Sequence, residues 1–378
     1  MNPRTRSVLL VLAAIGGLLV ALLGALQLFA PEVVADGLPP SLVAVWLGMP
    51  AAGAIAIAAG LAALTVALPA LRSRSRAASR RSRTLSTVAS LVVALAVAAL
   101  TPGGTIPVAG YTFVLVVAAG IVASLVLLLI RRPVIGLVVI VVVAAAVVLV
   151  SLRLPLGTFA PMVLGRLATS VTFMIVAAAH LVTAAALVAW TVGAPTAGGR
   201  CDAWLRRRRR LITVLAALCA LPYVALRATW LTPWPLFAPA DIADHPDMLM
   251  TGLLLGSAML TGGFLTLSLV LPWADRFPRW LGLIGGRPVP VALAVIPASV
   301  VAVLFTAGGV ELIVSMAGAF GALEAALIFP FWLWGPLLVA AIRGYALHRA
   351  APFAAPRRDA TLGDDRPRAA ASTIPDAV

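Results

Sequence analysis

A block of five arginines, Arg206–Arg210, runs directly into an apolar stretch that begins at Leu211. About twenty residues later the stretch ends in three aromatic side chains, Trp230, Trp234 and Phe237. A basic block, an apolar run long enough to cross a bilayer and an aromatic belt together predict a membrane helix whose basic end is cytoplasmic. Because successive membrane helices alternate in direction, orienting this helix orients the others.

The composition argues against a water-soluble fold. Hydrophobic residues make up 62% of the 378-residue chain, charged residues only 11%, and the mean hydropathy is +1.09; soluble domains carry about 25% charged residues. All 28 basic residues are arginine, and most lie in short loops beside apolar runs. There they orient helices and meet anionic lipid headgroups, so the net charge of +15 predicts a lipid partner and no nucleic acid.

The apolar runs predict an all-α, polytopic bundle of about ten spans. The fifth run is almost pure Val, Ile and Ala, and we expect it to face lipid. The last hydrophobic region is too short for three spans, so we expect Gly308–Ala322 to lie at the outer surface or to re-enter it. The predicted spans are Val8–Ala30, Leu42–Ala70, Thr87–Thr101, Tyr111–Ile130, Pro133–Leu152, Leu167–Thr191, the run from Leu211, Met248–Leu271, Pro290–Ala307 and Leu323–Ile342.

The arginines predict the topology. With both termini in the cytoplasm, 25 of the 28 arginines fall in cytoplasmic segments, Arg153 and Arg166 lie outside, and Arg227 lies within a span. This is the pattern of a multi-pass protein of the cell membrane, here a bacterial inner membrane. We expect residues 1–348 to form a single transmembrane domain and residues 349–378, rich in Ala, Pro, Arg and Asp, to form a disordered cytoplasmic tail.

Charged residues inside spans are the best pointers to function in a membrane protein, and Arg227 is the clearest. It follows Tyr223 by one helical turn and precedes Trp230. One interpretation is a cation that faces a cavity and binds an anionic headgroup or a substrate carboxylate, with Tyr223 donating a hydrogen bond. The other is an arginine that snorkels to the outer interface, held by Trp230 and Trp234. Pro222 is expected to kink the helix below it.

Three further residues complete the candidate substrate-binding set of Tyr223, Arg227, His180, Glu311 and Glu324. His180 falls near the middle of a span, as a proton relay or as a neutral histidine bonded to a neighbouring Ser or Thr. Glu311 and Glu324 fall at the outer end of the last hydrophobic region, where either could pair with Arg227. Such a pair would serve structure, or a substrate or ion site.

The remaining features predict no catalytic pair, cofactor or metal centre. The outer run Asp241–Asp247 has three aspartates and His245 but matches no strong metal motif, and Cys201 and Cys219 are expected to be unpaired. The absence of lysine removes the Walker motif of an ATP-driven pump.

Two apolar patterns have structural and functional interpretations. Gly252 and Gly256 have GxxxG spacing, which predicts close helix packing. Four bulky aromatics cluster around Pro330, one just before it and three between it and Pro336. They predict a packed core or the wall of an apolar ligand cavity. These aromatics are Phe329, Phe331, Trp332 and Trp334.

The Pro222-Tyr223 pair followed by Arg227 and Trp230 resembles a pattern in uncharacterised multi-spanning membrane proteins of high-GC actinobacteria. The resemblance implies a membrane protein and no specific activity. From the residues we expect a permease-like protein with a polar cavity around Arg227 in its outer half. One alternative is a membrane-embedded scaffold or partner subunit of a signalling or envelope complex. The other is an intramembrane enzyme that acts on lipid-linked substrates through outer carboxylates with His180 or His245. A protein partner or a homo-oligomer is compatible with each of these functions.

Overall fold

The structure is a computed structural model that describes residues 1–35, 38–72, 80–152, 156–194, 199–238, 242–279 and 285–354. Apart from turns and connecting loops, the described residues are helical, and they contain no strand. The helices are α1 (Pro3–Phe29), α2 (Pro31–Ala35), α3 (Leu42–Leu47), α4 (Met49–Arg72), α5 (Arg80–Ala99), α6 (Thr105–Arg131), α7 (Pro133–Ser151), α8 (Leu156–Thr169), α9 (Val171–Val192), α10 (Arg200–Leu218), α11 (Leu221–Thr229), α12 (Pro246–Ser268), α13 (Val291–Phe320), α14 (Ala322–Ile328) and α15 (Phe331–Ala354), with single 3-10 turns at Ile242–Asp244 and Pro272–Ala274.

Within the described residues, seven helices are long and apolar enough to cross a bilayer, and α14 with α15 forms an eighth candidate bent by 43°. Two shorter apolar helices, Thr84–Ala99 and Pro133–Leu149, fall below that length. The predicted all-α fold is therefore confirmed, and the described residues contain seven or more helices that are candidate membrane spans by length and composition.

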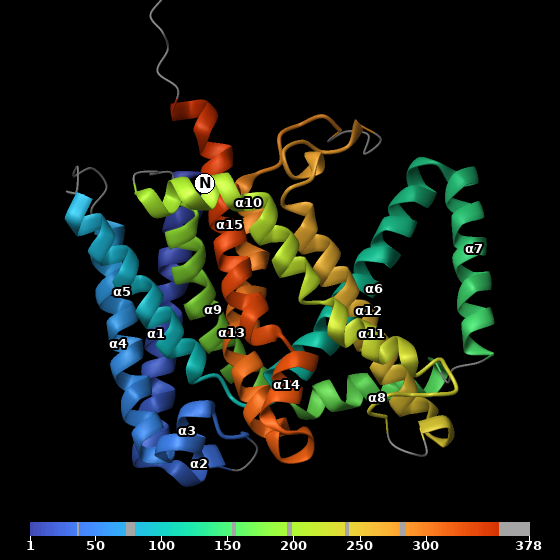
Figure 1. The fold of residues 1–378 in the computed structure, drawn as a ribbon, viewed down its shortest axis with the longest axis horizontal. Helices are drawn as coiled ribbons and strands as arrows, with labels where there is room; N and C mark the ends of the chain where they lie inside the picture. Colours follow the sequence, from blue (N-terminus) through green and yellow to red (C-terminus); the bar gives the residue numbers. More distant parts are fainter. Residues whose placement is uncertain are drawn as a thin grey trace, which may run out of the picture.

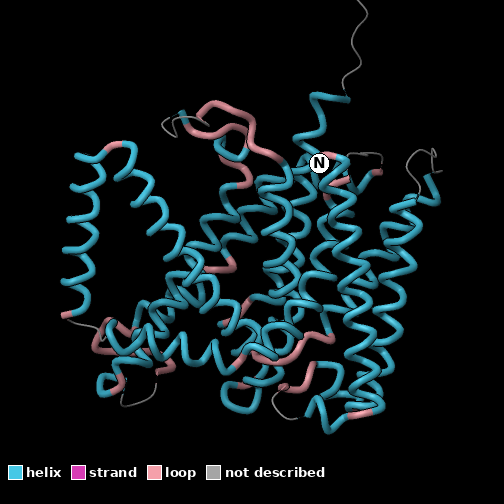
Figure 2. The backbone as a smooth tube through the Cα atoms, turned by 180° about the vertical axis from the view of Figure 1, so that it is seen from behind, coloured by secondary structure: helices cyan, strands magenta, loops and turns pink. Residues whose placement is uncertain are grey.

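The helices form one tight group and one splayed pair (Figures 1 and 2). Helices α1, α4 and α5 lie side by side on one flank, α9, α13 and α15 fill the centre, and α6 and α7 lean away on the other flank. Helix α7 packs mainly on α6, and most of its side chains are exposed, including Val134, Val142 and Leu149. This exposure fits the expectation that the fifth apolar run faces lipid.

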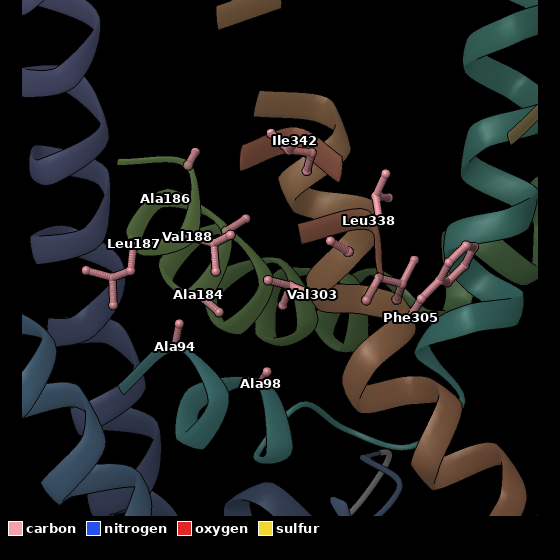
Figure 3. Close-up of a cluster of buried hydrophobic side chains, with 14 of the residues drawn as sticks. Ala94, Ala98, Ala184, Ala186, Leu187, Val188, Val303, Phe305, Leu338 and Ile342 are labelled. Atoms are coloured by element: carbon pink, nitrogen blue, oxygen red, sulfur yellow. The ribbon is translucent and has the colours of Figure 1, made fainter. Parts of the chain in front are cut away.

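Small residues set the closest packing in the bundle. Helices α1 and α4 approach so closely at Gly24 and Gly53 that a Cβ atom on Gly24 would lie 2.7 Å from the carbonyl oxygen of Gly53. Small residues on both helices allow the two backbones to approach in this way. The centre is built from alanine, leucine, valine and isoleucine contributed by four helices, as Figure 3 shows for Ala94, Ala98, Ala184, Leu187, Val303, Leu338 and Ile342.

Arginines tie the elements together at one end of the bundle. Arg343 of α15 binds Asp202 of α10 through two hydrogen bonds, Nε to Oδ1 at 3.1 Å and Nη2 to Oδ2 at 2.7 Å. It also donates to the carbonyl oxygens of Val192, the last residue of α9, and of Ala194, at 3.0 and 2.7 Å. One side chain therefore joins α15 to the connection between α9 and α10. We call this the arginine end.

The chain's beginning and a further connection reach the same end. The guanidinium of Arg6 lies 5.5 Å from the ring centroid of Trp190, near the close of α9. Arg349 donates to the carbonyl oxygens of Ala274 and Val289, at 2.7 and 2.8 Å, in the connection between α12 and α13. The N-terminus, α10 and the far end of α15 thus meet at the arginine end.

Several boundaries differ from the predicted ones. The run Leu42–Ala70 is broken at Gly48, whose φ of +84° ends α3 before α4 begins. The connector at 153–166 contains most of α8, which lies across the end of the bundle opposite α10 (Figure 1). The ninth span does not stop at Ala307, because α13 continues to Phe320 and leaves no surface loop at residues 308–320.

The fourth difference concerns the arginines, most of which were expected in short loops, because the block Arg206–Arg210 forms part of helix α10. Helix α15 extends to Ala354, past the predicted start of the tail at residue 349. Residues 355–378, the rest of the predicted disordered tail, lie outside the described residues.

Candidate functional site

The site begins at a break between two helices. Helix α10 ends at Leu218 and α11 begins at Leu221, one residue before Pro222. Proline has no backbone N–H, so Pro222 cannot donate to the carbonyl of Leu218 and the helical ladder is interrupted there. The chain bridges the gap with tighter bonds, from Cys219 N to Ala216 O among others. The helix is interrupted near Pro222 as the missing donor requires, while Arg200–Thr229 still counts as a single candidate span.

Helix α11 brings the predicted trio onto one face. Tyr223 and Trp230 are 5% and 8% exposed, and Arg227 lies between them. The guanidinium carbon of Arg227 is 4.0 Å from the ring centroid of Trp230 and 4.9 Å from that of Tyr223. Residues four and three apart share a helix face, which explains why both rings reach the same cation. Two cation–π contacts hold the guanidinium in place.

Arg227 has no acidic partner within the part of the chain that the structure describes. It forms no ion pair, and its Nε is buried without a hydrogen-bond partner. Neither Glu311 nor Glu324 pairs with it, although the sequence offered both. A partly buried cation with two aromatic faces and no anion is an incompletely satisfied charge.

The two glycines of the GxxxG motif in α12 form the floor beneath these side chains. A Cβ atom on Gly252 would lie 2.6 Å from Cζ3 of Trp230, and one on Gly256 would lie 3.1 Å from Cβ of Arg227. The predicted close packing is present, but the glycines receive side chains of α11. The GxxxG spacing predicted close packing, but it did not indicate that the packing partners would be Arg227 and Trp230.

A turn after α11 closes over the same side chains. The indole Nε1 of Trp230 donates to the carbonyl oxygen of Leu236 at 3.1 Å, and the backbone N–H of Leu236 donates to Oγ1 of Thr229 at 3.0 Å. The next residue, Phe237, has a φ of +52°, a left-handed conformation that costs a non-glycine residue about 1–2 kcal/mol. The bonds at Leu236 hold this strained residue against the cavity described next.

A cavity of about 270 Å³ lies beside Arg227. Arg227, Tyr223 and Phe237 line it together with residues of α6, α12 and α13 and the bend between α14 and α15. Its other walls are apolar, among them Ile106, Leu226, Leu255, Met259, Leu312 and Met316. The chamber is therefore hydrophobic, with one cation and one phenol at its side.

Three aromatics of the cluster at the bend line the cavity or pack in the core, whereas Trp332 does neither, because it is 41% exposed and does not line the cavity. Phe329 and Phe331 line the cavity, and their ring centroids lie 5.6 and 6.2 Å from that of Tyr223. Trp334, one turn further along α15, is fully buried and packs on Phe305 at 4.7 Å. The cavity wall and the packed core therefore meet at Phe331, which lines the cavity and is 2% exposed.

The other three candidates lie elsewhere. His180 is 3% exposed and its Nδ1 lies 2.8 Å from the carbonyl oxygen of Val176 on its own helix, not from a Ser or Thr, and it does not line the cavity. Glu311 accepts a hydrogen bond from the backbone N–H of Gly104 at 3.4 Å. Glu324 is exposed in the first turn of α14.

No protein-family model, curated protein or solved structure matches this chain, so function has to be inferred from the geometry of the site. Within the described residues, no group of three or more His, Cys, Asp or Glu side chains is placed to hold a metal ion. Cys201 and Cys219 are free, the first exposed and the second buried.

Proposed function

We propose that this protein is permease-like and that the cavity at Arg227 binds an anionic, amphipathic substrate. One observation carries the proposal: a half-buried guanidinium, without an anion among the described residues, lines a cavity of about 270 Å³. A charge withdrawn from water without a partner is costly, and intramembrane charges of this kind mark substrate pathways. A carboxylate or phosphate that enters the cavity would supply the missing partner and could form a bidentate pair with the guanidinium.

The apolar walls define the rest of the substrate. A cavity of this size holds several water molecules or a short acyl chain. Binding an anion alone would leave most of the apolar wall hydrated, whereas an acyl chain would displace that water and add hydrophobic stabilisation. An anionic head on an apolar chain therefore fits both halves of the lining.

The topology we propose has ten spans: the eight candidates and the two shorter apolar helices. Alternating directions then bring both termini to the arginine end, which faces the cytoplasm of a bacterial cell by the positive-inside rule. The cavity falls in the outer half. Reporters fused after residues 86 and 247 are expected in opposite compartments, and a common compartment would refute this topology.

The two alternative functions have less support. An enzyme acting on lipid-linked substrates needs a catalytic group beside the ligand, and neither His180 nor Glu324 lines the cavity. A scaffold function does not require a cavity that is lined by a cation. Full retention of ligand response after loss of the Arg227 charge would restore the scaffold hypothesis.

The experiment compares thermal unfolding of the purified chain in neutral detergent with three probes of one chain length: decanoate, decanol and decyltrimethylammonium. We expect decanoate alone to raise the melting temperature strongly. Arg227→Gln should abolish that rise, while Arg166→Gln, the same substitution at an exposed site on α8, should retain it. Arg227→Lys should keep a reduced response, since it retains the charge but not the planar fork. An undiminished decanoate response in Arg227→Gln would refute the proposal.

A further inference from the structure

A second, much smaller cavity lies beside α13 at the same end of the bundle as the Arg227 cavity. Its volume is about 10 Å³, the space of a single water-sized particle. Glu311 of α13 lines it, together with Thr101 and Thr105 on either side of the turn that joins α5 to α6. This segment is irregular: the chain leaves helical geometry after Ala99 and resumes it at Thr105.

Only one of the two carboxylate oxygens of Glu311 accepts a hydrogen bond within the described residues. Its Oε2 accepts the N–H of Gly104, the residue that precedes α6 and has a φ of +72°. Within the described residues, Oε1 accepts no hydrogen bond, so one anionic oxygen remains available to a ligand.

An unpartnered hydroxyl in the same cavity is an independent sign of a ligand. Thr101 is 9% exposed, and its Oγ1 is buried with no hydrogen-bond partner. Leaving a buried hydroxyl unpaired is unfavourable, so such a group calls for a water or an ion. Oγ1 of Thr105 donates its proton to the carbonyl oxygen of Pro102, which leaves its lone pairs free to coordinate a cation.

We propose that this cavity is a sodium site. Its ligands are the carboxylate of Glu311 and the hydroxyl oxygens of Thr101 and Thr105, with backbone carbonyls of the irregular turn completing the shell. Oxygen ligands suit a hard cation. One carboxylate neutralises a monovalent ion, whereas a divalent ion would leave an uncompensated charge in a low-dielectric setting. A bound proton would need neither the free space nor the unpaired hydroxyl.

The cation site shares two walls with the Arg227 cavity. Glu311 lines the small cavity and the next residue, Leu312, lines the large one. At the start of α6, Thr105 likewise lines the small cavity and Ile106 lines the large one. A cation that fixes Glu311 against the turn before α6 therefore also fixes two walls of the substrate chamber. This coupling rests on the proposed function, but cation binding itself does not.

The test measures the melting temperature of the purified full chain, without decanoate, in sodium, potassium or choline chloride at one ionic strength. Sodium is expected to raise the melting temperature saturably and choline to leave it unchanged. Glu311→Gln should abolish the sodium response, and Thr101→Val should weaken the apparent sodium affinity at least about tenfold. Glu324→Gln, which changes an exposed glutamate on α14, should respond like the unmodified chain.

The same variants separate a cation site from a purely structural cap. Glutamine at position 311 still offers an oxygen to the N–H of Gly104, so Glu311→Gln should fold and melt normally in choline. No sodium-specific rise in the unmodified chain, or an equal rise in Glu311→Gln, would overturn the proposal. Stabilisation by acid alone, with no sodium effect, would identify a proton site instead and would also overturn it. Decanoate binding, measured in choline, tests the proposed function separately.

Discussion

Substituting Gly252 by alanine tests the arrangement around Arg227 through one added methyl group. The new Cβ atom would lie 2.6 Å from Cζ3 and 2.9 Å from Cε3 of Trp230, closer than real Cβ contacts come. The indole cannot recede freely, because it is 8% exposed and its Nε1 is bonded to Leu236. Gly252→Ala must therefore shift α12 or displace the ring from Arg227.

The expected cost follows from what is displaced. Overpacking a tight site costs about 1–3 kcal/mol. Loss of the indole hydrogen bond would add about 0.5–1.5 kcal/mol and loss of the cation–π contact at 4.0 Å about 0.5–1 kcal/mol. Alanine recovers about 1 kcal/mol of helix propensity over glycine. We expect Gly252→Ala to destabilise the protein by about 1–4.5 kcal/mol in net terms.

Gly262→Ala on the same helix is the matched control. Its Cβ atom would meet Trp334 at 3.5 Å, an ordinary van der Waals contact, so the substitution should be neutral or stabilising. The assay is thermal unfolding of both variants in neutral detergent, with and without decanoate. Gly252→Ala should melt lower and bind decanoate more weakly than Gly262→Ala. Equal melting temperatures in the two variants would refute the packing of Trp230 on α12.

Three further variants test the fold around the site. Arg343→Gln removes the bidentate pair with Asp202 and should destabilise the chain by about 2–4 kcal/mol; a double-mutant cycle with Asp202→Asn should give a coupling energy well above zero, and additive effects would contradict the pair. Phe237→Gly relieves a left-handed φ and should raise the free energy of unfolding by about 1 kcal/mol while weakening decanoate binding; a fall in stability would count against the strain. Gly24→Val should separate α1 from α4 and abolish folded expression, whereas Gly120→Val, which has open space around it, should express normally; similar yields would disprove the close contact.

Class and local geometry could be predicted from the sequence. The apolar runs and arginine clusters indicate a membrane bundle because lipid requires satisfied backbone groups and apolar surfaces, whatever the tertiary packing. The contacts of Arg227 with Tyr223 and Trp230 follow from spacing alone, since residues three and four apart share a helix face. The break at Pro222 follows from a missing backbone donor.

Helix ends were harder to predict because glycine has two meanings in a membrane helix. At Gly48 the chain turns through a positive φ and a predicted span breaks. At Gly308 and Gly309 the helix α13 continues, and the glycines instead allow close approach to Ile106 and to the backbone at Phe331. Only the neighbouring elements decide which role a glycine takes.

The partners of the candidate residues depended on tertiary structure. Glu311 was expected near Arg227 because both were assigned to the outer half, but the fold directs its carboxylate to Gly104 across 207 residues of chain. Sequence position fixes depth along a helix, and it does not fix the face that a charge presents to other helices. For the same reason, the sequence did not predict that Thr101 and Glu311 would line the same cavity.

The most direct test of the account is the accessibility of a cysteine inside the Arg227 cavity. Two variants are made in a Cys219→Ala background. The first combines Met316→Cys with Cys201→Ser and carries one thiol, in the cavity wall. The second has no further substitution and carries one thiol, the exposed Cys201 on α10 near the arginine end. A membrane-impermeant, anionic thiol reagent is applied to intact cells. We predict that position 316 reacts from outside and is protected by decanoate but not by decanol, and that Cys201 reacts only after permeabilisation. Reaction of Cys201 in intact cells, or of position 316 from the cytoplasmic side alone, would contradict an outward cavity that binds anions at Arg227.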